Sequence, residues 1–156
     1  MECDFNKLNV WIDTNKMDSI LNNLISNAIK YTPEGGQITI TLKKHAKDWE
    51  MNIADTGIGI SSKDQRKLFK YHFRGNNAIN QRITGCGIGM LQTYQLVKRH
   101  AGQISVWSKE NVGTTFTLSF PIKSSVYKYQ RSPKKSPKKE MLPLINLPEP
   151  VPDYVT

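Results

Sequence analysis

Apolar residues recur at helical spacing in one long segment near the amino terminus. Side chains three and four positions apart share one face of a helix, so the spacing predicts an amphipathic helix over residues 15–31. Asp13 or Thr14 can cap its first turn, and Pro33 with the glycine pair after it ends the helix. The apolar stripe consists of Met17, Ile20, Leu21, Leu24, Ile25, Ala28 and Ile29.

Alternating apolar and polar residues mark the strands. Four segments alternate in this way, and each is expected to bury one face. They are residues 38–42, 49–55, 103–108 and 114–120, the last two joined by a turn at 111–113. A shorter apolar run at residues 10–12 predicts one more strand, ahead of the first helix.

Two further helical segments complete the pattern. Ser61 and Ser62 mark a helix start, and Ser62 with Gln65 matches a capping box. Residues 75–87 form a polar, glycine-bearing loop, and residues 88–100 form a second long amphipathic helix. This order of elements predicts an α/β two-layer sandwich, with one mixed sheet and about three helices on one face.

The composition changes abruptly near residue 122. All ten glycines lie before Pro121, whereas residues 123–156 are rich in proline and carry seven Lys or Arg and three acidic residues. We therefore expect one domain at 1–122, followed by a Lys/Pro-rich linker or disordered tail at 123–156. The net charge of +9 raises one hypothesis about function, that the protein binds nucleic acid or an anionic membrane through residues 128–139. That basic run is more typical of a solvated linker, so no such contact is expected from the domain.

Two further properties narrow the class of protein. No apolar run approaches the ~20 residues that cross a bilayer, and the start has no secretory signal pattern. Cys3 and Cys86 are too few for a disulfide framework or a closed zinc site. Reduced cysteines and a cytoplasmic location are the expectation.

Polar residues form a second stripe on the first predicted helix. On an ideal helix Asn27 and Lys30 both lie within about 40° of Asn23. Amide oxygens can ligate a hard divalent cation, and a lysine can contact a phosphate. The alternative is an ordinary solvated polar face.

Asp55 stands where a predicted strand ends, and Gly57 and Gly59 follow it. A carboxylate there can accept a hydrogen bond from an exocyclic amine such as that of adenine, and the glycines let the backbone approach a flat ring. The alternative is an ordinary Asp-Thr-Gly turn.

A second glycine-rich segment, with glycines at 85, 87 and 89, leads into the helix at 88–100. Backbone N–H groups at a helix start can bind phosphates. A dinucleotide fingerprint is unsupported because no predicted strand precedes the loop, and no Walker lysine is present. The alternative is a flexible loop closed by glycines.

Together and in this order, the motifs resemble the ATP-binding catalytic domain of sensor histidine kinases, within the superfamily that also holds gyrase, heat-shock chaperones and MutL. The resemblance covers residues 6–122 and implies a Bergerat-type fold with a mobile ATP lid at about 64–87. The matching segments are residues 21–33 for the N box, 55–59 for G1, 67–75 for the F box, 85–89 for G2, and 113–116 with 120–121 for the closing strands.

The resemblance implies a role for each matching residue. Asn27 would ligate Mg²⁺ on the triphosphate, with support from Asn23. Lys30, Arg74 and the glycines of the second loop (Gly85, Gly87 and Gly89) would contact phosphate. Asp55 would accept from the adenine amino group and share a water with Thr114. The rest of the implied nucleotide pocket is formed by Tyr31, Gly57, Gly59, Ile60, Phe69 and Ile88.

The chain departs from the family pattern at three places. His72 stands where the F box usually has Phe, and Cys86 stands where G2 usually has Thr. The lid residues Arg74 and Arg82 align poorly. These departures leave a second hypothesis open, a degenerate nucleotide-binding regulatory module without phosphotransfer.

The ATPases of the superfamily that this chain resembles have a general-base Glu four residues before the metal-binding Asn. Asn23 occupies that position here. Since an amide cannot deprotonate water, the resemblance favours phosphoryl transfer over hydrolysis. Serine kinases of the superfamily remain an alternative, although residues 26–33 look most like a sensor histidine kinase.

No phospho-accepting histidine is evident. His45, His72 and His100 all lack a following acidic residue in a helical run. We therefore expect a catalytic fragment whose partners are a histidine-bearing dimerisation domain and a downstream receiver domain. The isolated domain is expected to be monomeric, and the full-length protein, a sensor possibly anchored in a membrane, to be a homodimer.

Overall fold

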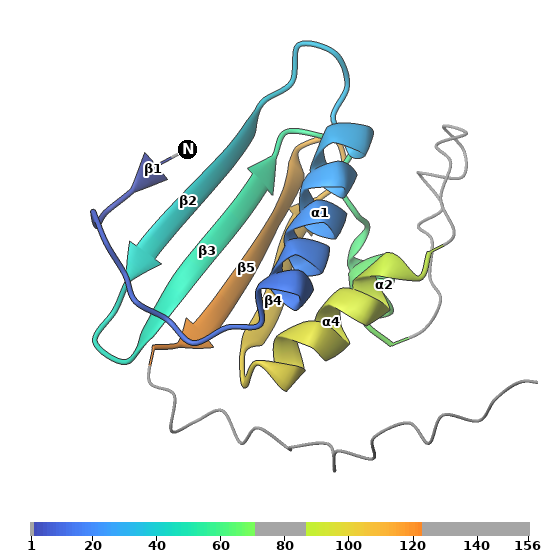
Figure 1. The fold of residues 1–156 in the computed structure, drawn as a ribbon. Helices are drawn as coiled ribbons and strands as arrows, with labels where there is room; N and C mark the ends of the chain where they lie inside the picture. Colours follow the sequence, from blue (N-terminus) through green and yellow to red (C-terminus); the bar gives the residue numbers. More distant parts are fainter. Residues whose placement is uncertain (1, 71–86, 123–156) are drawn as a thin grey trace, which may run out of the picture.

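The computed structural model describes residues 2–70 and 87–122, which build a five-stranded sheet in the order β1-β2-β3-β5-β4 (Figure 1). β1 runs parallel to β2, and the other neighbours are antiparallel, so the sheet is mixed as predicted. The strands are β1 (Glu2–Cys3), β2 (Ile38–Lys44), β3 (Asp48–Asp55), β4 (Gln103–Lys109) and β5 (Gly113–Pro121).

The helices of the described ranges form a second layer on one face of this sheet (Figure 1). They are α1 (Thr14–Tyr31), α2 (Ser62–Gln65) and α4 (Gly89–Arg99). The predicted two-layer α/β sandwich is thereby confirmed. Within the same ranges, no helix is both long and apolar enough to cross a membrane.

α1 begins and ends close to the predicted bounds. Asp13 is the N-cap, and its carboxylate accepts a hydrogen bond from the Lys16 N–H at 3.1 Å, a contact worth about 1 kcal/mol. At the other end the Thr32 hydroxyl donates to the Ala28 carbonyl at 2.6 Å. The face toward the sheet is fully buried at Met17, Ile20, Leu24 and Ala28.

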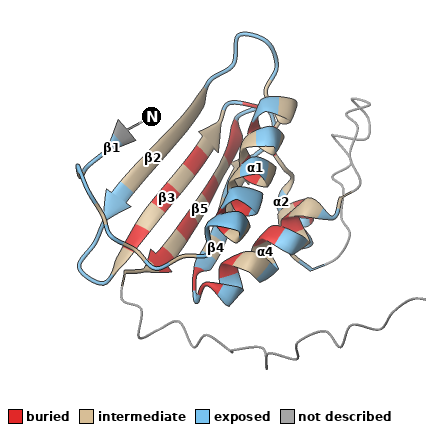
Figure 2. Ribbon diagram, viewed as in Figure 1, coloured by how far each residue is buried: buried red, intermediate tan, exposed pale blue. Residues whose placement is uncertain are grey.

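The core lies between α1, α4 and the inner face of β3 and β5, as the buried positions in Figure 2 show. Every second residue of these strands is buried, which is the pattern that alternation predicts for a sheet covered on one side. The inward row consists of Trp49, Met51, Ile53, Phe116, Leu118 and Phe120. Asp55 and Thr114 continue the two rows at one end of the sheet.

The strand predicted at residues 10–12 is wrong. The side chains of Val10 and Ile12 pack against the core while Trp11 is 70% exposed, but no strand pairs with this segment. The alternation therefore reflects contact with the core alone. The first strand is instead β1, which pairs with the outer edge of β2.

The capping box predicted from Ser62 to Gln65 is also wrong. Ser61 is the N-cap, and its hydroxyl accepts from the Asp64 N–H at 3.1 Å. Ser61 has extended dihedrals, whereas Ser62 is already helical and so cannot cap. The amide of Gln65 points elsewhere and bonds carbonyls outside the helix.

Several predictions lie outside the described residues. Residues 71–86 hold most of the predicted lid, with His72, Arg74, Arg82, Gly85 and Cys86. The predicted tail at 123–156 lies outside as well.

Candidate functional site

Asp55 ends β3 and faces the helix layer directly opposite Thr114 of β5. One carboxylate oxygen, Oδ1, accepts hydrogen bonds from the Gly57 N–H at 2.9 Å and from the Thr114 N–H at 3.2 Å. Burial raises the pKa of Asp55 above its ordinary value, and these two bonds offset part of that rise. The carboxylate is therefore held in place by Oδ1, while Oδ2 has no partner among the described residues.

The two glycines after Asp55 lie where the backbone leaves no room for a side chain. A Cβ on Gly57 would collide with the Tyr31 carbonyl oxygen at the end of α1. Gly59 has a φ of +66°, and a Cβ there would collide with the Lys109 carbonyl oxygen. The Ile58 N–H donates to the Tyr31 carbonyl at 3.0 Å. The loop is thus held between α1 and the end of β4.

A hydroxyl network that the sequence analysis missed supports this loop. The Ser108 Oγ accepts from the Ile60 N–H at 2.8 Å, donates to the Gly113 carbonyl at 2.8 Å, and lies 3.0 Å from the Thr114 Oγ1. Gln65 of α2 donates to the Ile60 carbonyl at 2.8 Å and to the Ser108 carbonyl at 2.7 Å. One signal was available, because Ser108 follows Ile104 and Val106 on the inward row of its strand.

The three residues of the predicted polar stripe on α1 have different surroundings. The Asn23 amide nitrogen donates to the hydroxyl of Thr93, which is buried on α4. Asn27, one turn later, is half-buried, and its side chain forms no hydrogen bond with the described residues. The Lys30 ammonium lies 5.2 Å from the centre of the Tyr31 ring.

The start of α4 approaches Asn23 closely. A Cβ on Gly89 would collide with the Asn23 side-chain oxygen. Gly87 has a φ of +71°, and Ile88, the N-cap, supplies no side-chain hydrogen bond. The first N–H groups of α4 therefore lack a side-chain cap.

α1 joins the two halves of the predicted site. Its carboxyl end contacts the Asp55 loop through the Tyr31 carbonyl, and its middle contacts α4 through Asn23.

Phe69, predicted to line the nucleotide pocket, stacks on Tyr94 of α4 with ring centres 5.6 Å apart. Ile60 is half-buried against the core, and Ile88 is 41% exposed.

The described residues contain no group of three His, Cys, Asp or Glu side chains that could hold a metal ion. The candidate donors on α1 are the side-chain amides of Asn23 and Asn27. Amide oxygens suit a hard cation such as Mg²⁺, which commonly takes one or two protein ligands and completes its shell with water and phosphate oxygens. The donor chemistry of Asn23 and Asn27 therefore fits that ion.

The chain resembles known proteins over most of its length. Residues 12–124 match the family model described as "Histidine kinase-, DNA gyrase B-, and HSP90-like ATPase". The sensor-like histidine kinase SenX3 of Mycobacterium tuberculosis is 34% identical over 134 residues, which cover 86% of this chain and 33% of the relative. The sensor histidine kinase WalK of Bacillus subtilis is 37% identical over 118 residues, which cover 74% of this chain and 19% of WalK. The chain thus spans a third or less of the length of these relatives.

Solved structures agree with the sequence comparison. The catalytic domain of histidine kinase ThkA superposes with a TM-score of 0.67 at 27% identity, over 78% of this chain and 77% of that one. The mycobacterial sensor histidine kinase MprB gives a TM-score of 0.63 at 25% identity, over 72% of this chain and 76% of that one. By sequence and by fold, the chain belongs to the histidine kinase-, DNA gyrase B- and HSP90-like ATPase family, with sensor histidine kinases as its relatives.

Proposed function

We propose that this domain binds Mg-ATP and donates the γ-phosphate to a histidine on a separate dimerisation domain in two-component signalling. The observation that carries the proposal is the Asp55 carboxylate, which two backbone N–H groups fix through Oδ1 while Oδ2 has no partner in the described part of the chain. An acceptor held in this way beside a glycine loop suits the exocyclic amine of adenine. Gly57 lets this loop lie against the Tyr31 carbonyl because it has no side chain.

The phosphates would lie between α1 and the start of α4. In this proposal Asn27, which has no other partner in the described ranges, ligates Mg²⁺, and Asn23 stands one turn away. The ion would neutralise charge on the triphosphate. Lys30 and the uncapped N–H groups at the start of α4 would bind phosphate oxygens.

The proposed chemistry is phosphoryl transfer. An imidazole nitrogen of the acceptor attacks the γ-phosphorus in line, a P–N bond forms, the bond to the ADP oxygen breaks, and the imidazole proton leaves to solvent. The Asn23 amide nitrogen is engaged with Thr93, and an amide is no general base, so attack by water receives no help at this position. Transfer to a positioned histidine is therefore favoured over hydrolysis.

The partners follow from the same proposal. The relatives carry names of sensor histidine kinases, and the chain spans a third or less of their length. We propose a histidine-bearing dimerisation domain as acceptor, a receiver domain downstream, and a cytoplasmic location. The isolated domain is proposed to be monomeric within a homodimeric full-length protein.

The decisive experiment is a calorimetric titration of Mg-ATP and Mg-ADP into the domain and into Asp55→Asn. Asp48→Asn is a matched control, because Asp48 starts the strand that Asp55 ends. We expect wild type and Asp48→Asn to bind equally, and Asp55→Asn to bind at least ~10-fold more weakly, the effect of about 1.4 kcal/mol. A folded wild type that binds no nucleotide would refute the proposal.

Phosphotransfer is tested separately by supplying a histidine kinase acceptor domain in trans. Formation of acid-labile phosphohistidine on that domain is the expected result. Binding without transfer to any acceptor would favour the degenerate regulatory module, which the departures at His72 and Cys86 also suggest.

A further inference from the structure

We propose that Thr93 is a positioning residue for the triphosphate, because it holds the Asn23 amide against the first turn of α4 and so sets the affinity for phosphate groups. This inference rests on the proposed function, since it concerns the proposed phosphate space between α1 and the start of α4. Thr93 lies outside every motif that the sequence analysis singled out.

Thr93 is a polar residue in the buried stripe of α4. The buried positions of this helix are Met90, Thr93 and Val97, and Thr93 is only 1% exposed. A hydroxyl buried to this extent needs a hydrogen-bond partner, because an unpaired one costs free energy. Among the described residues its side-chain partner is the Asn23 amide nitrogen, which donates at 2.5 Å. The bond to Asn23 therefore distinguishes Thr93 from the apolar residue that such a position favours.

The Asn23 amide lies against two residues of α4, Gly89 and Thr93. These two residues are one turn apart and share a face of the helix. A Cβ on Gly89 would collide with the Asn23 side-chain oxygen, so the glycine leaves the space that the amide occupies. The amide oxygen thus lies beside the first residue of α4, and the amide nitrogen is held one turn later by Thr93.

The Thr93 bond connects α1 to the end of α4 that is proposed to bind phosphate. At the other end of α4, His100 joins the helix to the start of α1 through the Asp13 N–H. Thr93 is closer to the first N–H groups of α4, which lack a side-chain cap. Loss of its hydroxyl would free the first turn of α4 to shift against the helix that carries Asn27. Thr93 is too deeply buried to touch a nucleotide, so it acts through Asn23.

The Asp55 end of the proposed site is held by other contacts. The Asp55 carboxylate accepts from the Gly57 and Thr114 N–H groups, neither of which lies on α1 or α4. Removing the Thr93 hydroxyl should therefore weaken the contacts of the phosphates and leave those of the base unchanged. A general loss of stability would instead weaken the binding of every ligand alike.

The test compares the dissociation constant of Mg-ATP, measured by calorimetry, with that of adenosine, measured by NMR titration, because only ATP carries phosphates. The proteins are wild type, Thr93→Val, Thr93→Ser and the control Thr115→Val on the open sheet face. We expect Thr93→Val to bind Mg-ATP ~5-fold more weakly, the worth of about one hydrogen bond, and adenosine as wild type does. Thr93→Ser keeps the hydroxyl, so it and Thr115→Val are expected to bind both ligands as wild type does.

A double-mutant cycle shows whether Thr93 acts through Asn23. Asn23→Ala is expected to weaken Mg-ATP binding, and adding Thr93→Val to it is expected to weaken that binding no further. Equal weakening of both ligands in Thr93→Val, no weakening of either, or a full additional loss in the double variant would overturn the inference alone. Absence of Mg-ATP binding by folded wild type would instead overturn the proposed function, and this inference with it.

Discussion

The strand pair β3–β5 has two ends of opposite character on the same sheet face. At one end Trp49 and Phe120 stack with ring centres 5.1 Å apart, and the His100 ring meets Phe120 edge-on at 6.2 Å. Phe120 is completely buried. At the other end the same two strands place Asp55 opposite Thr114.

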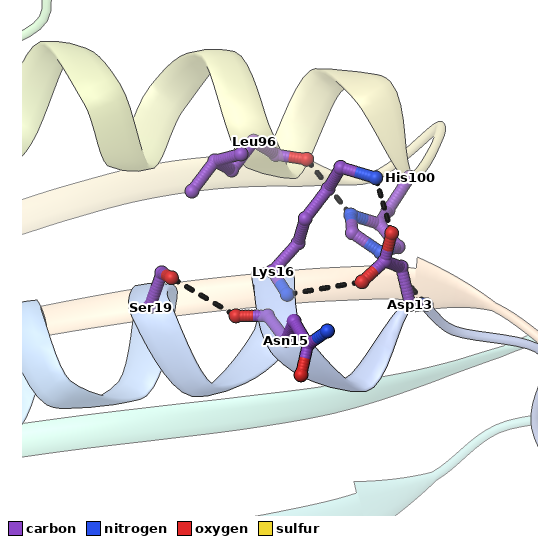
Figure 3. Close-up of polar contacts among 6 residues, drawn as sticks. All are labelled: Asp13, Asn15, Lys16, Ser19, Leu96 and His100. Carbon is purple, nitrogen blue, oxygen red and sulfur yellow. Dashed lines mark hydrogen bonds and ion pairs between the residues drawn. The ribbon is translucent and has the colours of Figure 1, made fainter. Parts of the chain in front are cut away.

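The aromatic end contains a polar group whose two ring nitrogens both have partners (Figure 3). The Nε2 of His100 accepts from the Asp13 N–H at 3.2 Å, and its Nδ1 lies 2.9 Å from the Leu96 carbonyl oxygen. Because the N–H only donates and the carbonyl only accepts, the ring is the neutral tautomer with its proton on Nδ1. Asp13 is in turn the cap of α1 and pairs with Lys16.

The difference separates stability from function within one pair of strands. The aromatic end uses its polar groups to join α1 to α4, and only the Trp49 indole N–H is buried there without a partner among the described residues. The opposite end keeps a partly buried carboxylate, one oxygen of which has no partner in residues 2–70 and 87–122, an arrangement that costs stability and suits ligand binding. Substitutions at the aromatic end should therefore lower the free energy of unfolding, whereas substitutions at the Asp55 end should mainly weaken ligand binding.

The largest effect is expected from Phe120→Ala. Removing a fully buried aromatic ring that contacts both Trp49 and His100 should lower the free energy of unfolding by about 3–5 kcal/mol, measured by urea denaturation. Trp107→Ala, at a 61% exposed position on the open sheet face, is the control and should change it by less than about 0.5 kcal/mol. Similar losses in both variants would contradict the placement of the core.

His100→Ala should have the next largest effect. It removes the ring nitrogen that accepts from the Asp13 N–H and the ring contact to the Leu96 carbonyl, which keeps only the backbone N–H of residue 100, at a cost of about 1–3 kcal/mol. The exposed His45→Ala is the control, and circular dichroism during urea unfolding gives the comparison. Equal stability of the two variants would show that the His100 contacts between α1 and α4 contribute nothing to the free energy of unfolding.

Thr93→Val tests the connection between the two ends, because Thr93 lies on α4 opposite Asn23. The variant keeps the side-chain shape and removes the hydroxyl that accepts from Asn23, so a loss of about 1 kcal/mol is expected. Thr115→Val, on the open face, serves as the control. A more stable Thr93→Val would show that the Asn23 amide finds an equally good partner elsewhere.

Asp55→Asn should have the smallest effect on stability, with a size that depends on pH. The folded-state pKa of Asp55 lies above the ordinary value of 3.8, so the folded state binds the proton more tightly than the unfolded state. The free energy of unfolding therefore falls as the pH rises from about 3.8 through the raised pKa, and the wild type carries that cost at neutral pH.

The asparagine keeps an oxygen for the Gly57 and Thr114 N–H groups and carries no charge. Without nucleotide, we expect Asp55→Asn to match or exceed the stability of wild type at neutral pH, with the difference vanishing below about pH 3.8. Urea denaturation across pH 3–8 measures it, with Asp48→Asn as the control. A deficit that grows with rising pH would show that the charged form is the one the fold stabilises.

The sequence by itself determined the elements whose signal is local. The period of α1, the alternation of β2 to β5 and the Asp55–Gly57–Gly59 segment all follow from neighbouring residues, since burial on one face imposes the pattern on each element separately. The inward row of β4 also placed a hydroxyl, Ser108, where the network beside the Asp55 loop is found, although that signal was missed.

The tertiary structure decided which distant groups meet. His100 bonds a residue 87 positions away, Ser108 bonds Ile60 across 48 positions, and Asn23 meets Thr93 across 70. Residues 10–12 show the reverse case, an alternating segment that pairs with no strand. Local pattern reports which side of a segment is buried, whereas the partner of a polar atom depends on packing between elements, which no stretch of sequence encodes alone.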